Sequence, residues 1–256
     1  MRLVVSIALC SLALFDAMLG QSFIKMVKGG KMESFISKKK GEKVIIDNFM
    51  MSDHAVTNAE FKEFVDKNPR WKKSSVSRLL ADRNYLSHWT SDNSFPPSMA
   101  QKGVTNVSWH AAKAYCAWKG GTLPTNVQWE FALSKQHRSI KTGAVVSVND
   151  VLLQWYANAN PLETLGGIIN TDGIKDLVGA GWEWTENFNE LIINGDSRGN
   201  SNQESNLVCG SASLNSNDVK NYARFIRIAF RTSLKASTTT KNLGFRICYS
   251  HKEIAQ

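Results

Sequence analysis

Apolar residues at helical spacing follow a helix-capping residue at several places in the chain. Thr57 and Glu60 have the spacing of a capping box, in which an N-cap hydroxyl and a carboxylate three residues later bond the free N–H groups at a helix start. The apolar residues that follow on one face are Phe61, Phe64 and Val65. The pattern predicts a helix that begins after Thr57 and ends at the Asn-Pro pair of residues 68–69.

Two more capped helices are predicted on either side of a Gly-Gly-x-Leu-Pro turn. Ser108 can cap the first, which stops at Gly120. Thr125 and Gln128 form a second capping box. The apolar positions of these helices are Ala112, Tyr115 and Cys116, then Trp129, Phe131, Ala132 and Leu133. A compact helix pair is expected rather than a bundle.

Period-2 alternation predicts strands towards both ends of the chain. Residues 23–46 alternate around glycines and indicate two short strands joined by turns. Residues 221–233 and 243–249 indicate two more, in one antiparallel sheet with the first. Arg227, Arg231 and Arg246 lie in these last segments, where they either line a pocket for an anionic or peptide substrate or form surface salt bridges.

The middle of the chain has little regular pattern. Residues 143–195 hold many Asn and Gly, with one helical stretch near 151–157. No internal repeat and no linker composition divides the chain. The sequence therefore predicts one α+β domain, residues 21–256, with a small antiparallel sheet, few short helices and many loops.

Residues 1–20 stand apart from that domain. Arg2 precedes an apolar run that is too short to span a bilayer and is followed by small residues. We interpret this segment as a secretory signal peptide, and Leu9 before Cys10 does not suit lipoprotein cleavage. The mature chain is expected to be exported, periplasmic or secreted, without stable membrane insertion.

The net charge of +9 is scattered along the sequence. It lacks the clustered basic and aromatic stripe of nucleic-acid modules, so a solvated basic surface is expected and no nucleic-acid partner. Three cysteines follow the signal segment, Cys116, Cys209 and Cys248, and an exported chain can keep a disulfide. No spacing of Cys and His suits structural zinc.

The densest chemistry lies in residues 173–187, which hold two Trp, a glycine turn and alternating carboxylates. Such a stretch needs a fixed geometry. Either an oxygen-ligand metal site, or a core loop pinned by the indoles, or both, would explain it.

Several motifs together resemble the formylglycine-generating enzyme, or sulfatase-modifying factor, family, in that family's order. They are VTNAEF (56–61), VSWHAAKAYCAW (107–118), LPT with WE (123–125, 129–130), the stretch 173–185 and GFR (244–246). Each motif alone is weak, but five in register are specific. The resemblance implies an irregular fold similar to C-type lectins over nearly the whole mature chain.

The resemblance also implies a calcium ion in the central stretch. The matching ligands are Asp176, Gly179, Gly181 and Glu183, and hard oxygen donors from a tight turn suit calcium. The alternative is that Asp176 and Glu183 only hydrogen-bond the turn.

The family's copper chemistry, by contrast, has no matching thiols. Formylglycine-generating enzymes oxidise a substrate cysteine with two copper(I)-binding cysteines. Their positions fall here on Leu214 and on Ala223, or on Val219 if no gap is opened. Copper(I) ligation of that kind is therefore not expected.

Other residues near that interval remain as candidates. Ser211 matches a serine near the family's active site, Cys209 lies two residues earlier, and Arg227 follows. Relatives also pair the helix cysteine matching Cys116 with one after the last Gly-Phe-Arg. That implies a Cys116–Cys248 disulfide, with Cys209–Cys248 as the alternative because one residue intervenes before Cys248.

Different function classes follow from these observations. The first is an exported accessory, maturation or ligand-binding protein without copper-cysteine chemistry, which acts on an exported protein, peptide or small molecule. Its binding surface would lie in the polar loop of residues 195–219. The second is an oxidative maturation enzyme that uses Ser211 and Cys209, and a third is a structural domain of a surface assembly. The sequence gives no oligomeric state.

Overall fold

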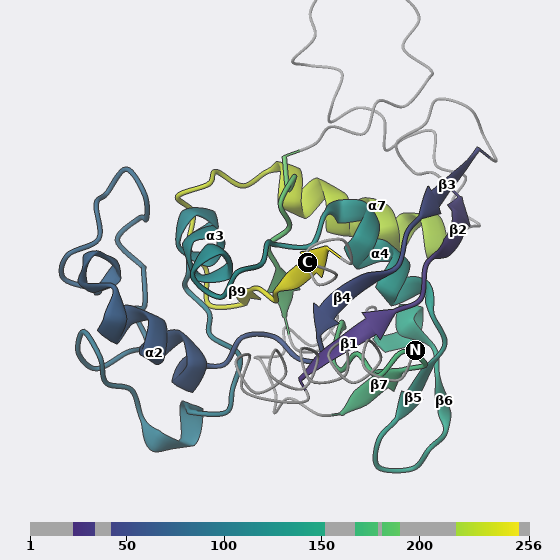
Figure 1. Cartoon of the computed structure of the whole chain (residues 1–256), viewed down its shortest axis with the longest axis horizontal. Helices are drawn as coiled ribbons and strands as arrows, with labels where there is room; N and C mark the ends of the chain where they lie inside the picture. Colours follow the sequence, from purple (N-terminus) through teal and green to yellow (C-terminus); the bar gives the residue numbers. More distant parts are fainter. Residues whose placement is uncertain (1–22, 34–41, 152–166, 179–180, 190–218, 251–256) are drawn as a thin grey trace, which may run out of the picture.

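The computed structural model describes residues 23–33, 42–151, 167–178, 181–189 and 219–250. Its regular elements are short and separated by long loops (Figure 1). The helices are α2 (Asn58–Lys67), η1 (Pro69–Trp71), η2 (Pro97–Met99), α3 (Trp109–Trp118), α4 (Asn126–Ser134) and α7 (Val219–Thr232). The strands are β1 (Ile24–Val27), β2 (Gly30–Glu33), β3 (Lys43–Ile46), β4 (Phe49–Ser52), β5 (His137–Ser139), β6 (Val145–Val146), β7 (Ile168–Asn170), β8 (Trp182–Glu183), β9 (Leu243–Gly244) and β10 (Cys248–Ser250).

Strand β4 joins the two ends of the domain. It lies between β1 and β10 in an antiparallel sheet, with Val27 opposite Phe49 and Cys248 opposite Met51. Strands β8 and β9 pair in parallel, with Glu183 opposite Gly244. The C-terminal strands therefore bring the central stretch against the N-terminal sheet.

The remaining strands form two small antiparallel sheets, β2-β3 and β6-β5-β7. Figure 1 shows these strands at one end of the molecule and α2 with its loops at the other, with α3, α4 and α7 between them. The predicted α+β class, with few short helices and small sheets, is confirmed.

The predicted caps explain where the helices begin. The hydroxyls of Thr57 and Thr125 accept hydrogen bonds from the N–H groups three residues later, and both capping boxes are complete. Ser108 caps α3 through the N–H of Ala111. Gly120, with a φ of 76°, follows that helix in the left-handed conformation that favours glycine.

Two apolar clusters form the core. The first packs aromatic side chains of α2 and α3 against the C-terminal strands, and it includes Phe61, Tyr115, Trp184 and Phe245. The second joins β1, β4 and α4 around residues such as Trp129. Tyr85, Leu86 and Trp89 are also buried in the first cluster.

Three strand predictions were wrong. Residues 219–232 form helix α7, because Arg224, Arg227 and Arg231 recur at helical spacing and meet the buried carboxylate of Glu130 on α4. Arg231 also donates to a backbone carbonyl of β8. Residues 23–46 contribute three strands instead of two, and β1 pairs with β4, which was not predicted. The final segment splits into β9 and β10 in different sheets, since the two strands have different partners.

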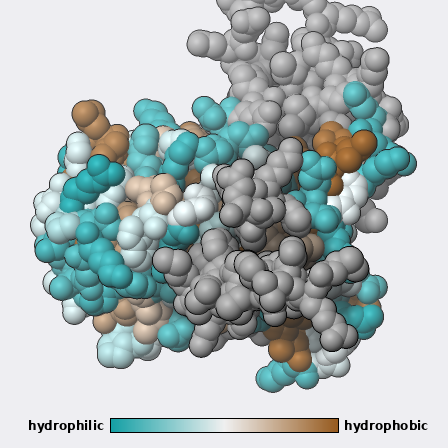
Figure 2. Space-filling view, in the orientation of Figure 1, coloured by the Kyte–Doolittle hydropathy of each residue, from teal (hydrophilic) through white to brown (hydrophobic). Residues whose placement is uncertain are grey.

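The described surface is mostly polar. Figure 2 shows hydrophilic side chains over most of the described part of this face, with small separate hydrophobic spots. The exposed large apolar residues are Phe23, Met26, Ile45, Leu79, Ile140 and Val145. Among the residues searched, none of the helices has the length and apolarity needed to span a membrane.

Candidate functional site

The loop of residues 173–187 turns tightly at Asp176. This residue is buried, and its φ of 52° lies in the left-handed region. Its Oδ1 accepts hydrogen bonds from the N–H groups of Gly167 and Ile168, at 2.9 and 3.0 Å. Gly181 adopts a φ of 131°, which only glycine tolerates easily. The side chain of Asp176 thus fixes the turn before β8.

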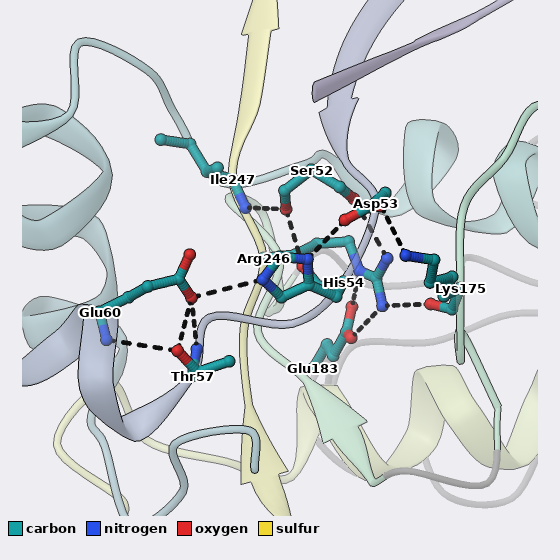
Figure 3. Close-up of polar contacts among 9 residues, drawn as sticks. All are labelled: Ser52, Asp53, His54, Thr57, Glu60, Lys175, Glu183, Arg246 and Ile247. Atoms are coloured by element: carbon teal, nitrogen blue, oxygen red, sulfur yellow. Dashed lines mark hydrogen bonds and ion pairs between the residues drawn. The ribbon is translucent and has the colours of Figure 1, made fainter. Parts of the chain in front are cut away.

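Glu183 on β8 forms a buried ion pair with Arg246. Arg246 donates from Nε to Oε2 and from Nη2 to Oε1, both at 2.7 Å (Figure 3). Trp129 also donates to Oε2, at 2.7 Å. The guanidinium also donates to the carbonyls of Ser52 and Lys175, at 3.4 and 3.2 Å. Arg246 therefore ties the central loop to β4.

The two indoles of the loop pack into the core. Trp182 stacks on Phe230 of α7, with 4.4 Å between ring centroids. Trp184 is fully buried, and its Nε1 donates to the carbonyl of Val107 at 2.9 Å. Both side chains anchor the stretch in the core, as the sequence suggested.

The predicted calcium site is described in part. Gly179 lies outside the described residues, and within the described ranges no group of three or more His, Cys, Asp or Glu side chains is arranged to hold a metal ion. Asp176 and Glu183 have protein donors, as the hydrogen-bonding alternative expects. Yet Oε1 of Glu183 accepts one protein hydrogen bond from Arg246, and a carboxylate oxygen can accept two. Gly181 also bends the chain beside that carboxylate, so these residues fit a calcium ion and the site stays a prediction.

A second buried carboxylate, Glu130 on α4, meets three arginines of α7. Arg227 donates to both of its oxygens, at 2.9 and 2.6 Å. Arg231 lies 3.5 Å from Oε1 and Arg224 lies 3.7 Å from Oε2. Burial raises the pKa of Glu130, but the charge and hydrogen bonds of Arg227 outweigh it, so the pKa lies below its ordinary value.

The three arginines that were predicted to line a pocket or to form surface salt bridges have neither role in the structure. Arg227, Arg231 and Arg246 are buried, at 5%, 0% and 0% exposed. Helix α7 replaces the predicted strand and directs two of them at Glu130, while Arg246 pairs with Glu183. They form ion pairs in the interior, which the predicted strand pattern did not indicate.

A third polar cluster joins the start of α2 to β4. The Nδ1 of His54 lies 2.5 Å from Asp53, and its Nε2 lies 3.5 Å from Glu60, the capping-box residue (Figure 3). Lys175 donates to the other oxygen of Asp53 at 2.9 Å. Burial lowers the pKa of His54, but hydrogen bonds to Asp53 and Glu60 outweigh it and raise the pKa to about 9.

The carboxylates of this cluster shift the other way. Burial raises the pKa of Asp53, but hydrogen bonds from His54 and Lys175 outweigh it, and the pKa falls below its ordinary value. The same balance, with His54 and the backbone of Thr57 as donors, lowers the pKa of Glu60. His54 is therefore protonated at neutral pH and holds two carboxylates together.

Sequence reasoning missed this cluster, since no motif singled out His54. The adjacent Asp53-His54 pair, six residues before the capping-box Glu60, was the available signal. For the Glu130 cluster the sequence signal was weaker: Glu130 is the only acidic residue of α4. Its arginine partners are 97 and 101 residues away along the chain.

The candidate catalytic residues are only partly placed. Ser211, Cys209 and Leu214 lie outside the described residues, and Ala223 lies in α7 directly before Arg224. The guanidinium of Arg227 donates a hydrogen bond to the carboxylate of Glu130. Convergence of Ser211, Cys209 and Arg227 on one pocket thus remains a hypothesis.

The two described cysteines are not joined in this structure. Cys116 and Cys248 are both free and buried, and the predicted disulfide stays a prediction. Burial raises the pKa of both thiols well above the ordinary value. Backbone contacts bring their segments together, since the N–H of Gly121 donates to the Cys116 carbonyl and that of Thr122 donates to the Cys248 carbonyl.

Comparison with known proteins identifies relatives along most of the chain. An uncharacterized protein of Borreliella burgdorferi is 23% identical over 211 residues, covering 80% of this chain and 37% of that protein. The formylglycine-generating enzyme of Bos taurus is 25% identical over 260 residues, covering 82% of this chain and 67% of the enzyme. The inactive C-alpha-formylglycine-generating enzyme 2 of Mus musculus is 26% identical over 247 residues, covering 81% and 77%. The chain thus spans little more than a third of the Borreliella protein and about two thirds of the bovine enzyme.

Among solved structures, the Treponema denticola variable protein 1 aligns with a TM-score of 0.49 and 14% identity, over 91% of this chain and 97% of that one. The sulfatase-modifying factor enzyme 1-like domain matches residues 21–251. That range includes all the clusters described above. The chain belongs to the sulfatase-modifying factor enzyme 1-like family.

Proposed function

We propose that this chain is a member of the family that binds rather than oxidises. In this proposal it is an exported accessory, maturation or ligand-binding protein, and its partner is an exported protein, a peptide or a small molecule. Export rests on the signal-like segment of residues 1–20. Mass measurement of the mature N-terminus tests it, and an intact Met1 in the exported fraction would contradict cleavage.

The chemistry of the cysteines carries the proposal. Copper(I) ligation and thiol oxidation need accessible thiolates. The positions that match the copper-binding cysteines are Leu214 and Ala223, and the two described cysteines are buried with raised thiol pKa values. Neither Cys116 nor Cys248 is suited to replace the missing pair.

The relatives include proteins named as the enzyme and proteins named as inactive, and the latter support a non-oxidising member. The murine relative that covers 81% of this chain is named an inactive C-alpha-formylglycine-generating enzyme. The buried ion pairs of Glu130 and Glu183 join distant segments of the chain. This stabilising role involves no redox chemistry.

Peptide oxidation tests the proposal. The mature protein is incubated with oxygen, copper or iron and a cysteine-containing peptide, while oxygen uptake and peptide mass are followed. A formylglycine-generating enzyme is the positive control. We expect no uptake above the metal-only blank and no conversion of thiol to aldehyde. Metal-dependent turnover that disappears in Cys209→Ser would instead support the alternative, an oxidative maturation enzyme that uses Cys209 and Ser211.

We also propose that calcium, where it binds, is structural. Asp176 and Glu183 would supply side-chain oxygens, and Gly179 and Gly181 backbone carbonyls. The two carboxylates are buried within a loop in which Arg246 offsets one charge. The ion would stabilise the loop and take no part in a reaction.

A further inference from the structure

Helix α7 presents a row of arginines to the buried carboxylate of Glu130. Arg224, Arg227 and Arg231 recur at positions i, i+3 and i+7, on one helix face. All three approach the single carboxylate of Glu130. The other buried carboxylate of this region, Glu183, is paired with Arg246.

Two guanidinium nitrogens remain without partners in the interior. They are Nη1 of Arg227 and Nη2 of Arg231, both inaccessible to solvent and without a hydrogen bond. Arg246 differs, since its Nε, Nη1 and Nη2 all have acceptors. The surplus donors therefore belong to α7 alone.

The surroundings of Arg231 also differ from those of Arg246. Its guanidinium lies over the Trp129 ring, 4.4 Å from the centroid, and its Nε donates to the Glu183 carbonyl at 3.3 Å. Burial lowers the pKa of Arg231 to about 10, although Glu130 acts against the shift. A buried guanidinium with an open donor is costly unless an acceptor arrives.

We propose that Arg227 and Arg231 hold a small oxyanion, a carboxylate or phosphate group, through Nη1 and Nη2. Guanidinium groups match such anions in geometry and charge. Arg224 has the most exposed side chain of the three, at 26%, which places the entry to the site on its side. The open donors of Arg227 and Arg231 both belong to cationic groups, which favours an anion over a neutral ligand.

The site also lies next to the family's reaction position. Ala223, which matches the second copper-binding cysteine, directly precedes Arg224 on α7. The inference rests on the proposed function, because it names the class of ligand that the proposed binding protein would take. A failed oxidation assay and a failed anion titration are separate results.

Titration of the mature chain tests the site. Phosphate and succinate are added separately at constant ionic strength against chloride, and binding is followed by calorimetry and thermal melting. We expect saturable binding of phosphate or succinate, with a higher melting temperature, and no matching effect of chloride. Tighter binding of one of the two identifies a phosphate or a carboxylate ligand.

Variants locate the effect. Arg227→Lys keeps the charge but loses the fork that would hold the anion, and Arg224→Gln removes the positive charge at the entry; each should weaken binding about tenfold or more. Arg78→Gln, at an exposed arginine in a turn, is the matched control and should bind as the parent does. Arg224→Gln leaves the closer Arg227–Glu130 pair in place, so it is the variant to rely on if Arg227→Lys does not fold.

Two results would overturn the proposal. One is the absence of saturable binding by both anions. The other is binding that Arg224→Gln and Arg227→Lys leave unchanged in folded protein. Either would leave the three arginines as internal partners of Glu130 without a ligand.

Discussion

The guanidinium of Arg246 donates two hydrogen bonds to the carboxylate of Glu183, each 2.7 Å long, with both side chains buried. Glu183 lies on β8 and Arg246 follows β9, the parallel partner of β8. The pair thus fixes the central loop to the C-terminal segment from inside the core.

Removing one partner of this pair should destabilise the fold strongly. Arg246→Met leaves Glu183 buried without its cation, and such losses cost about 3–5 kcal/mol. Lys67→Ala, which removes an exposed ion pair with Glu63, should cost less than about 1 kcal/mol. Urea denaturation measures both. Equal losses in the two variants would show that Arg246 contributes no more than a surface charge.

The His54 cluster predicts a dependence of stability on alkaline pH. The pKa of His54 is raised from 6.5 to about 9, so its contribution is complete below pH 6.5 and is lost as the pH rises through 9. The free energy of unfolding should fall over that window, by at most about 1.4 kcal/mol per pH unit. Denaturant titrations from pH 6 to 9.5 measure the slope.

His54→Gln should flatten this slope, and His110→Gln is the control. Burial lowers the pKa of His110, so its effect falls on the acid side, where stability is lost as the pH drops below 6.5. A slope above pH 6.5 that persists in His54→Gln would assign it to other groups.

Calcium should raise the melting temperature if the loop binds it. Binding to the folded state alone stabilises by mass action, and we expect a shift of several degrees with calcium and its reversal by a chelator. Magnesium, which demands stricter octahedral geometry, should act less. Asp176→Ala should abolish the calcium shift. Identical melting curves with calcium and with chelator would remove the ion from the account.

The cysteine prediction is tested by peptide mapping without reduction. An oxidising compartment favours a bridge, and the segments of Cys116 and Cys248 adjoin through backbone hydrogen bonds. We expect a linked Cys116–Cys248 peptide in protein isolated after export. Linkage of Cys209 to Cys248 would support the alternative pairing. Alkylation of both buried thiols in denaturant before any reductant would show that they stay free.

Local sequence signals predicted the helix starts well. The capping boxes at Thr57 and Thr125 and the cap at Ser108 depend on residues three apart, and all three are confirmed. The anchoring Trp182 and Trp184 were also predictable, because large apolar residues in a loop need a core to pack against.

The α7 segment shows where local patterns failed. Its Tyr, Arg and Ile residues alternate, so period 2 and period 3.6 both fit over a few positions. The spacing of Arg224, Arg227 and Arg231 fits a helix. Their shared partner, Glu130, lies 97 residues from Arg227 along the chain, so the local pattern does not show that the helix is the state that pairs them. Contacts at such separations depend on the whole fold, which is why the buried ion pairs could not be read from the sequence.

Copper(I) binding by the reduced mature protein tests the central claim most directly. The chain is titrated anaerobically with copper(I) against a competing chelator, and Cys209→Ser is titrated in parallel. The account predicts no stoichiometric copper binding in either protein, because Leu214 and Ala223 replace the thiolate pair and Cys116 and Cys248 are buried. One tightly bound equivalent that is lost in Cys209→Ser would contradict it and restore an oxidative enzyme.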